Sequence, residues 1–246
     1  MRTQPHSRQT RGAHGEAGIS LIELLIAMGI MSIISAMILM SWFALSNSYS
    51  YSVTSNKARD NARQAIARVE REVRDAESHP NTSEVALVRA RPRWIVVSTT
   101  FNDGLNTNPN TLPRLVMYRL YPDGELWRFQ DADRDGVIAG VNMSPIDLWP
   151  APNSFSVAEQ TNGEGRTLLV KDVVNDKVPT TASPTPLFRY SLYESDGSLV
   201  QDTSVVGSTQ RARVVAAQIN LMVDVNPQRS PVYTEFQTTA QLRNQR

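Results

Sequence analysis

The hydrophobic pattern of the chain begins with one long apolar run that follows a polar, basic leader. From Ile19 to Leu45 about 27 residues are almost wholly apolar. As a helix they would span roughly 40 Å, more than the roughly 30 Å hydrocarbon layer of a membrane. Residues 19–45 therefore predict a transmembrane helix. Glu23 is the ionisable residue in this run, and a charge at mid-membrane costs roughly 2.5 to 3.5 kcal/mol unless it finds a partner.

A second apolar pattern extends the helix beyond this run, over residues 46–79. Val53 to Glu77 contains no glycine or proline, and Pro80 is a typical stop. A stripe at steps of four and three predicts an amphipathic helix, formed by Ala62, Ile66, Val69, Val73 and Ala76. Charged residues fill the other faces of this helix. We favour a solvated surface with pairs such as Glu70 to Arg74 over a filament or nucleic-acid contact. The charged residues are Arg59, Asp60, Arg63, Arg68, Glu70, Arg71, Glu72 and Arg74.

The remaining residues, 80–246, show the alternation of half-buried strands. Pro122-Asp123-Gly124 predicts a hairpin turn, because proline presets φ and glycine accepts a positive φ. A second hairpin is expected at the C-terminus. The predicted fold class is α+β, with the long N-terminal helix packed on an antiparallel sheet head domain. The expected strands are 85–90, 94–99, 115–121, 125–130, 154–158, 168–174, 187–194, 219–225 and 232–242.

The start of the apolar run carries a processing motif. A basic leader, Gly18, an aliphatic residue and then Ser-Leu-Ile-Glu-Leu-Leu resemble the motif of type IV prepilins and type II secretion pseudopilins. In that family a membrane peptidase cuts after the glycine, here Gly18, and methylates the new terminus, here Ile19, where phenylalanine is usual. Glu23 falls on the family's fifth mature residue. The resemblance implies that residues 1–18 are removed and that Glu23 pairs with a neighbouring subunit's terminus during assembly.

An ordinary secretory signal peptide or a plain signal anchor is the alternative interpretation. Signal peptides have an apolar region of about 7 to 15 residues, and this run is longer and carries a carboxylate near its start. Cutting after Gly18 would expose an ammonium group at Ile19. Glu23 lies one helical turn from it, where i and i+4 groups face each other and the helix dipole favours a negative charge.

Charge and composition restrict the remaining function classes. The leader contributes +2, so removing it from a chain of net charge +1 leaves −1. Its positive charge orients the helix with the C-terminal domain outside the cytoplasm, and nothing predicts nucleic-acid binding. The chain has no cysteine, and His79 is the histidine left after the leader. Cysteine or multi-histidine active sites are therefore not available.

An aspartate-rich segment suggests one metal. Asp131, Asp133 and Asp135 followed by a glycine match the first half of an EF-hand calcium loop. The Val137 carbonyl and Asn142 would complete the shell, although the twelfth position is normally glutamate. Calcium binding, weak and not required for function, is one interpretation, and a hairpin turn is the other.

Arg89, Arg91 and Arg93 alternate along an extended segment. They predict either a small basic patch on one side or an edge strand protected by charge and proline.

These features together predict a minor pilin of a type IV pilus system, a non-enzymatic subunit acting in assembly initiation or at the tip. Its partners would be the prepilin peptidase, other pilins and the cytoplasmic membrane. The chain looks most like PilW-like minor pilins and the J-type pseudopilin of type II secretion, and the pseudopilin is the alternative function. A membrane-anchored exported hydrolase using Asp131 and Asp133 is a further alternative.

Overall fold

The computed structural model of the chain describes residues 19–77, 85–100, 113–135, 137–141, 163–175, 185–203, 206–207, 209–224 and 233–242. The leader, Gly18, His79, Pro80, Asn142 and the strand expected at 154–158 lie outside the described residues. The contacts divide the chain into two compact units, Met1–Ser52 and Val53–Arg246. Each unit is considered by itself below.

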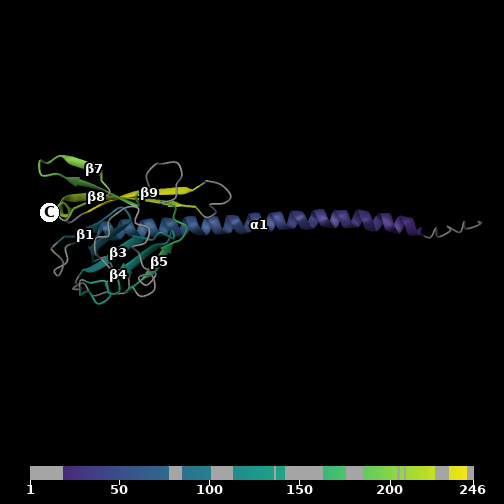
Figure 1. Cartoon of the computed structure of the whole chain (residues 1–246), viewed down its shortest axis with the longest axis horizontal. Helices are drawn as coiled ribbons and strands as arrows, with labels where there is room; N and C mark the ends of the chain where they lie inside the picture. Colours follow the sequence, from purple (N-terminus) through teal and green to yellow (C-terminus); the bar gives the residue numbers. More distant parts are fainter. Residues whose placement is uncertain are drawn as a thin grey trace, which may run out of the picture. The chain divides into compact units, whose positions relative to one another are not determined.

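One helix, α1, runs without interruption from Leu21 to Arg74 (Figure 1). The predicted transmembrane and amphipathic segments are thus both helical. The prediction that the helix continues to residue 79 was wrong. Ala76 forms a β-bridge with Thr99, and the Glu77 amide donates to the Ser98 carbonyl at 2.8 Å. These strand-type hydrogen bonds replace the helical ones, so the helix ends before the proline is reached.

The first sheet is antiparallel and has the order β1-β2-β3-β4-β5. The predicted hairpin at Gly124 is confirmed: Leu120 pairs with Leu126 across the turn, and Gly124 has a φ of 88°. A side chain at this glycine would also meet the Val173 carbonyl oxygen at 2.8 Å. The strands are β1 Leu87–Ala90, β2 Trp94–Thr99, β3 Arg114–Leu120, β4 Leu126–Gln130 and β5 Thr167–Val170.

A second antiparallel sheet has the order β7-β6-β8-β9. The predicted C-terminal hairpin is confirmed, because Val223 pairs with Thr234. Its first strand begins at Val214 rather than Ile219, since the Val214–Gln218 segment pairs with β6 although its sequence does not alternate. β7 was not predicted. The elements are β6 Phe188–Tyr193, β7 Leu199–Thr203, the short 3-10 helix η1 Arg211–Arg213, β8 Val214–Val223 and β9 Thr234–Gln241.

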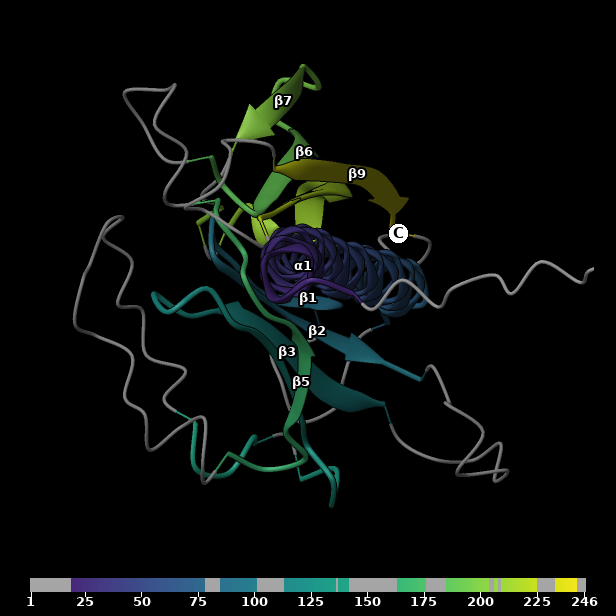
Figure 2. The same ribbon diagram turned by 90° about the vertical axis from the view of Figure 1, so that its right-hand side faces the viewer.

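Within the second unit, the C-terminal part of α1 lies between the two sheets (Figure 2). The predicted apolar stripe is buried: Ala62 and Val73 are fully enclosed, and the other three members are also in the core. One hydrophobic cluster contains residues of the helix and of both sheets. The α+β class is therefore confirmed, with two sheets sharing one helix where a single sheet was expected.

Candidate functional site

The amino-terminal end of α1 is organised by Ser20. The Glu23 amide donates to the Ser20 side-chain oxygen at 3.2 Å and to the Ser20 carbonyl at 3.0 Å, so Ser20 caps the helix. The role of Ser20 was missed at the level of the sequence, although Ser20 and Glu23 have the spacing of a capping box, which is a local signal. Glu23 is exposed in the first turn, close to the positive end of the helix dipole.

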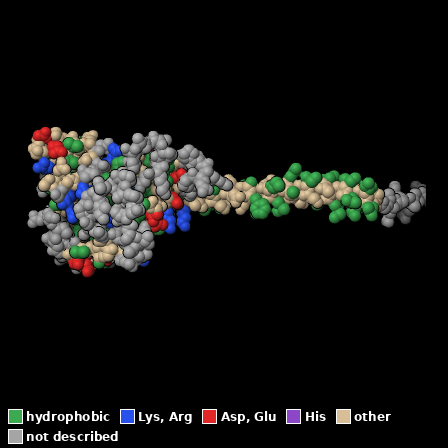
Figure 3. Space-filling view, in the orientation of Figure 1, with side chains coloured by type: hydrophobic (Ala, Val, Ile, Leu, Met, Phe, Trp, Pro, Cys, Tyr) green, Lys and Arg blue, Asp and Glu red, His purple; other side chains and the backbone are tan. Residues whose placement is uncertain are grey.

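The described part of the first unit presents a largely apolar surface, which the exposed Glu23 interrupts near its start. All its side chains are exposed, and hydrophobic side chains line the helix from Ile19 onward (Figure 3). Among the described residues, α1 is the helix long and apolar enough to cross a membrane, and none of its most apolar window is buried. Such a surface requires lipid or other helices as its surroundings.

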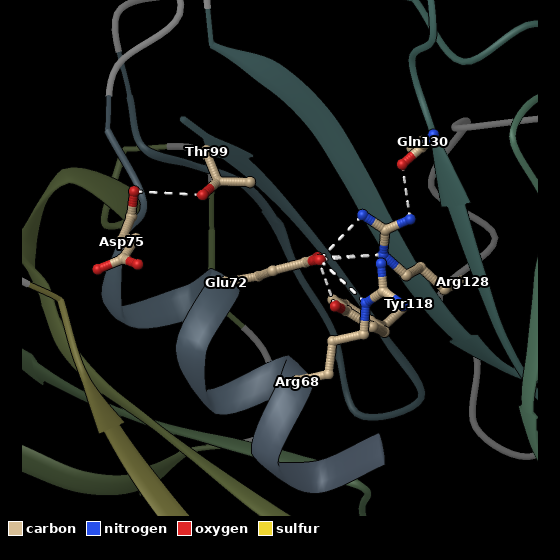
Figure 4. A network of polar contacts seen from close by, with 7 residues as sticks. All are labelled: Arg68, Glu72, Asp75, Thr99, Tyr118, Arg128 and Gln130. Carbon is tan, nitrogen blue, oxygen red and sulfur yellow. Dashed lines mark hydrogen bonds and ion pairs between the residues drawn. The ribbon is translucent and has the colours of Figure 1, made fainter. Parts of the chain in front are cut away.

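A buried carboxylate lies at the other end of α1. Glu72 is fully enclosed and receives hydrogen bonds from three side chains (Figure 4). Arg128 on β4 donates through Nη2 at 2.9 Å and through Nε at 3.1 Å, and Tyr118 on β3 donates its hydroxyl. Arg68, one helical turn earlier, donates at 3.3 Å. Arg128 also donates through Nη1 to the Gln130 side-chain oxygen at 2.7 Å. We call these residues, with Gln130, the Glu72 network.

The electrostatics of the Glu72 network favour one protonation state. Burial, and then the negative charge of Glu72, raise the pKa of Tyr118 well above its ordinary value. Burial opposes the charge of Arg128, but Glu72 outweighs it and the pKa of Arg128 rises. The network therefore keeps the Tyr118 phenol neutral and the Arg128 guanidinium charged. It is suited to fixing the helix against β3 and β4.

The prediction that Glu72 belongs to a solvated helix face was wrong. Glu72 lies three residues after Val69 and four residues before Ala76. This spacing places it on the same, buried side of the helix as these two residues. That spacing was a signal in the sequence, but the arginine that compensates the charge is 56 residues away. The predicted pair of Glu70 and Arg74 is confirmed.

The three predicted calcium ligands come together. Asp131, Asp133 and Asp135 each place a carboxylate oxygen within 4.8 Å of the others, with Asp131 buried. We call residues 131–137 the aspartate loop. Each of these carboxylates also accepts a backbone N–H, from residues 134, 135 and 137 at 2.6, 3.3 and 2.7 Å. The contribution of the Val137 carbonyl stays a prediction.

A carboxylate from a distant segment closes the aspartate loop. Glu164 accepts the Ala132 amide at 2.7 Å with one oxygen and the Ala139 amide at 3.0 Å with the other. This contact was missed because about 30 residues separate the two segments. The loop is therefore stabilised by backbone hydrogen bonds to carboxylates, as expected for a turn, and calcium binding by the same carboxylates stays a prediction.

The arginines around β1 do not form one patch. β1 is an edge strand, as one of the two interpretations predicted. Arg93 is buried in the turn between β1 and β2, where its carbonyl accepts the Leu120 amide at 2.9 Å. Arg89 and Arg91 are half-buried. The predicted basic patch thus retains two of its three members.

The exposed apolar helix and the β-rich second unit define a single-pass, membrane-anchored α+β protein. Residues 14–39 match the family model described as the prokaryotic N-terminal methylation motif. This motif is the hallmark of type IV prepilin-like pilins and pseudopilins, so the predicted resemblance is confirmed over the amino-terminal segment. No curated protein matches the chain.

Proposed function

We propose that the chain is a minor pilin of a type IV pilus system, a non-enzymatic filament subunit acting in assembly initiation or at the tip. The observation that carries the proposal is the methylation motif at residues 14–39, placed at the start of a helix whose apolar side chains from Ile19 to Leu45 are all exposed. Lipid before assembly and neighbouring helices after it would cover this surface. The basic leader supports a C-terminal domain outside the cytoplasm.

Glu23 is the residue to which we assign assembly. It is the carboxylate in an apolar helix surface, and an unpaired charge there is costly. Cleavage after Gly18 by the prepilin peptidase would create an ammonium group at Ile19. An ion pair between Glu23 and the amino terminus of a neighbouring pilin would leave no uncompensated charge in the apolar bundle. It would also fix the register of the new subunit.

The aspartate loop offers little support for the hydrolase alternative. Asp131 is buried and accepts the Arg134 amide, and Asp133 accepts the Asp135 amide. Carboxylates engaged in this way hold the backbone and are poorly placed to act as an acid and base pair. The scarcity of histidine and the absence of cysteine in the whole sequence support the same proposal.

The assembly role is tested by Glu23→Ala, with Ser32→Ala as the matched control. Ser32 lies in the same helix and donates to its own Met28 carbonyl at 2.8 Å, so its loss removes no charge. Both variants should insert into the membrane and be cleaved. Glu23→Ala should be missing from sheared filaments, whereas Ser32→Ala should be present at the wild-type level. Normal incorporation of Glu23→Ala would refute the pairing role.

Deletion of the whole chain distinguishes the two filament systems. A strain that loses pili and keeps protein secretion supports the minor pilin. A strain that keeps its pili and loses secretion supports the J-type pseudopilin instead, and contradicts the system we propose.

A further inference from the structure

Aromatic side chains gather where the apolar run of α1 gives way to polar residues. Trp42 and Phe43 lie near the end of the run, and Tyr49 and Tyr51 follow within the same helix. All four side chains are exposed. The polar residues that follow the run are uncharged up to Lys57, the first basic residue after it. We call Trp42, Phe43, Tyr49 and Tyr51 the aromatic belt.

The aromatic belt surrounds the helix. Tyr49 follows Trp42 by seven residues, or about two turns, so these two side chains share one side of α1. Tyr51 is nine residues from Trp42, or about two and a half turns, and therefore lies on the opposite side. A second helix would contact one side of α1, whereas the headgroup layer of a membrane surrounds it. This arrangement favours lipid as the partner of the aromatic belt.

The polar atoms of the aromatic belt have no partner in the described part of the chain. The indole nitrogen of Trp42 and the hydroxyls of Tyr49 and Tyr51 form no hydrogen bond to any described residue. Such rings are stable at a membrane interface, where the apolar body meets hydrocarbon and the polar atom reaches water or a headgroup. In the middle of the hydrocarbon layer the same atoms would lack partners.

The spacing between the aromatic belt and Glu23 matches the thickness of a membrane. Trp42 lies 19 residues after Glu23 in an uninterrupted helix, a rise of about 28 Å, close to the roughly 30 Å of the hydrocarbon layer. The whole run from Ile19 to Leu45 is longer than this layer, so one end must extend beyond it. With the aromatic belt at one edge of the hydrocarbon, Glu23 reaches the opposite edge.

We propose that the aromatic belt binds the lipid headgroup layer on the side where the chain continues to Val53, and that it sets the depth of α1 in the membrane. Glu23 is then solvated by water and headgroups in the free subunit. Its charge becomes uncompensated only when α1 enters a bundle of helices. The belt's role requires only that α1 spans a membrane, so it is independent of the filament in which the chain takes part.

The test uses single-cysteine variants of the full-length chain, which has no cysteine of its own. The substitutions Leu21→Cys, Ile30→Cys, Leu39→Cys and Ser48→Cys are all at exposed positions of α1, so no packing is lost. Each variant is placed in dioleoyl phosphatidylcholine vesicles and reacted from both sides with a charged maleimide. Leu21→Cys and Ser48→Cys should react at least about tenfold faster than the other two, because a thiol in hydrocarbon does not form the reactive thiolate.

A bilayer with longer acyl chains shows which edge is anchored. There Leu21→Cys should become protected while Ser48→Cys keeps its rate, because the aromatic belt holds its edge of the membrane and the thicker hydrocarbon covers more of the amino-terminal end.

A matched pair of double variants tests the aromatic belt itself in the thicker bilayer. Tyr49→Leu with Tyr51→Leu removes the two hydroxyls, so Ser48→Cys in this background should lose its fast reaction. Met37→Leu with Met40→Leu introduces the same two leucines within the apolar run and should leave the reaction of Ser48→Cys unchanged.

Three results would overturn the proposal in these vesicles. The first is a reaction of Leu39→Cys as fast as that of Ser48→Cys, and the second is a thicker bilayer that protects Ser48→Cys instead of Leu21→Cys. The third is equal behaviour of the two double variants. Protection that disappears when the protein is diluted with lipid would assign the rings to contacts between chains, and would also refute a lipid partner. Filament assembly enters none of these measurements, so their outcome is separate from that of Glu23→Ala.

Discussion

The Glu72→Gln substitution removes the carboxylate from the Glu72 network and leaves two arginines facing each other. Arg128 is almost completely buried, whereas the side chain of Arg68 keeps 31% of its surface exposed. Removing one partner of a buried ion pair costs about 3 to 5 kcal/mol, because the remaining charge is uncompensated in a poorly solvated place. We expect Glu72→Gln to lower the free energy of unfolding by this amount.

The structure also predicts an order among the variants. Arg128→Met leaves Glu72 with Arg68 and Tyr118, so one positive and one negative charge still balance. Its cost should be smaller, about 2 to 3 kcal/mol, the value of the lost charged hydrogen bonds. The double variant should cost less than the sum of the single variants by at least about 1 kcal/mol, because the two residues act as one unit.

The assay is urea unfolding of the full-length chain in detergent, followed by tryptophan fluorescence, since Trp94 is buried in the second unit. Glu70→Gln is the matched control: it is the same change two positions earlier, at a partly exposed residue paired with Arg74. Its cost should stay below about 1 kcal/mol, as for surface ion pairs. If Glu72→Gln is no more costly than Glu70→Gln, the buried charge does not carry the stability that we assign to it.

Three further predictions concern processing, calcium and pH. Mass spectrometry of the membrane form should find a chain beginning at N-methylated Ile19, whereas a terminus beyond Leu45 would indicate an ordinary signal peptide. The chain should melt at a higher temperature in millimolar calcium than in chelator, with an affinity of about 10⁻⁴ to 10⁻³ M. Asp133→Ala should remove that difference. If the melting temperature of the wild type is the same in calcium and in chelator, the aspartate loop is a turn only. Because the folded-state pKa of Tyr118 is raised, its stabilisation is complete below about pH 10 and is lost above it at about 1.4 kcal/mol per pH unit. Burial also raises the pKa of Tyr190, so both tyrosines contribute to the loss of stability in the wild type. Urea midpoints measured between neutral and alkaline pH should therefore fall less steeply in Tyr118→Phe than in the wild type, by about this slope, while Tyr193→Phe, at an exposed tyrosine, should keep the wild-type slope.

Local patterns in the sequence were sufficient for α1 apart from its C-terminal end, for most strands and for both hairpins. The apolar stripe of α1 and the turn at Gly124 depend on residues within a few positions of one another, so periodicity and turn chemistry predict them. The strands that were missed or shortened lack this local signal. The sequence of β7, Leu-Val-Gln-Asp-Thr, does not alternate apolar and polar residues, and the first half of β8 becomes a strand because β6 lies beside it.

The amino-terminal motif was also determined by the sequence itself. Gly18, Ile19 and Glu23 lie within one short segment, which a peptidase or a neighbouring helix would read as a local pattern. The family model matches this same segment. The predicted roles of the three residues follow from that pattern and from the cost of a charge in lipid, and they need no tertiary contact.

Only the tertiary structure decided which charged residues are buried and with what partners. Glu72 meets Tyr118 and Arg128 across 46 and 56 residues of sequence. A carboxylate on a helix is solvated or buried depending on what packs against it, and sequence periodicity contains no information on a partner so far along the chain. The division into two sheets around one helix has the same cause, because strand pairing at long range is settled by the packing of the whole core.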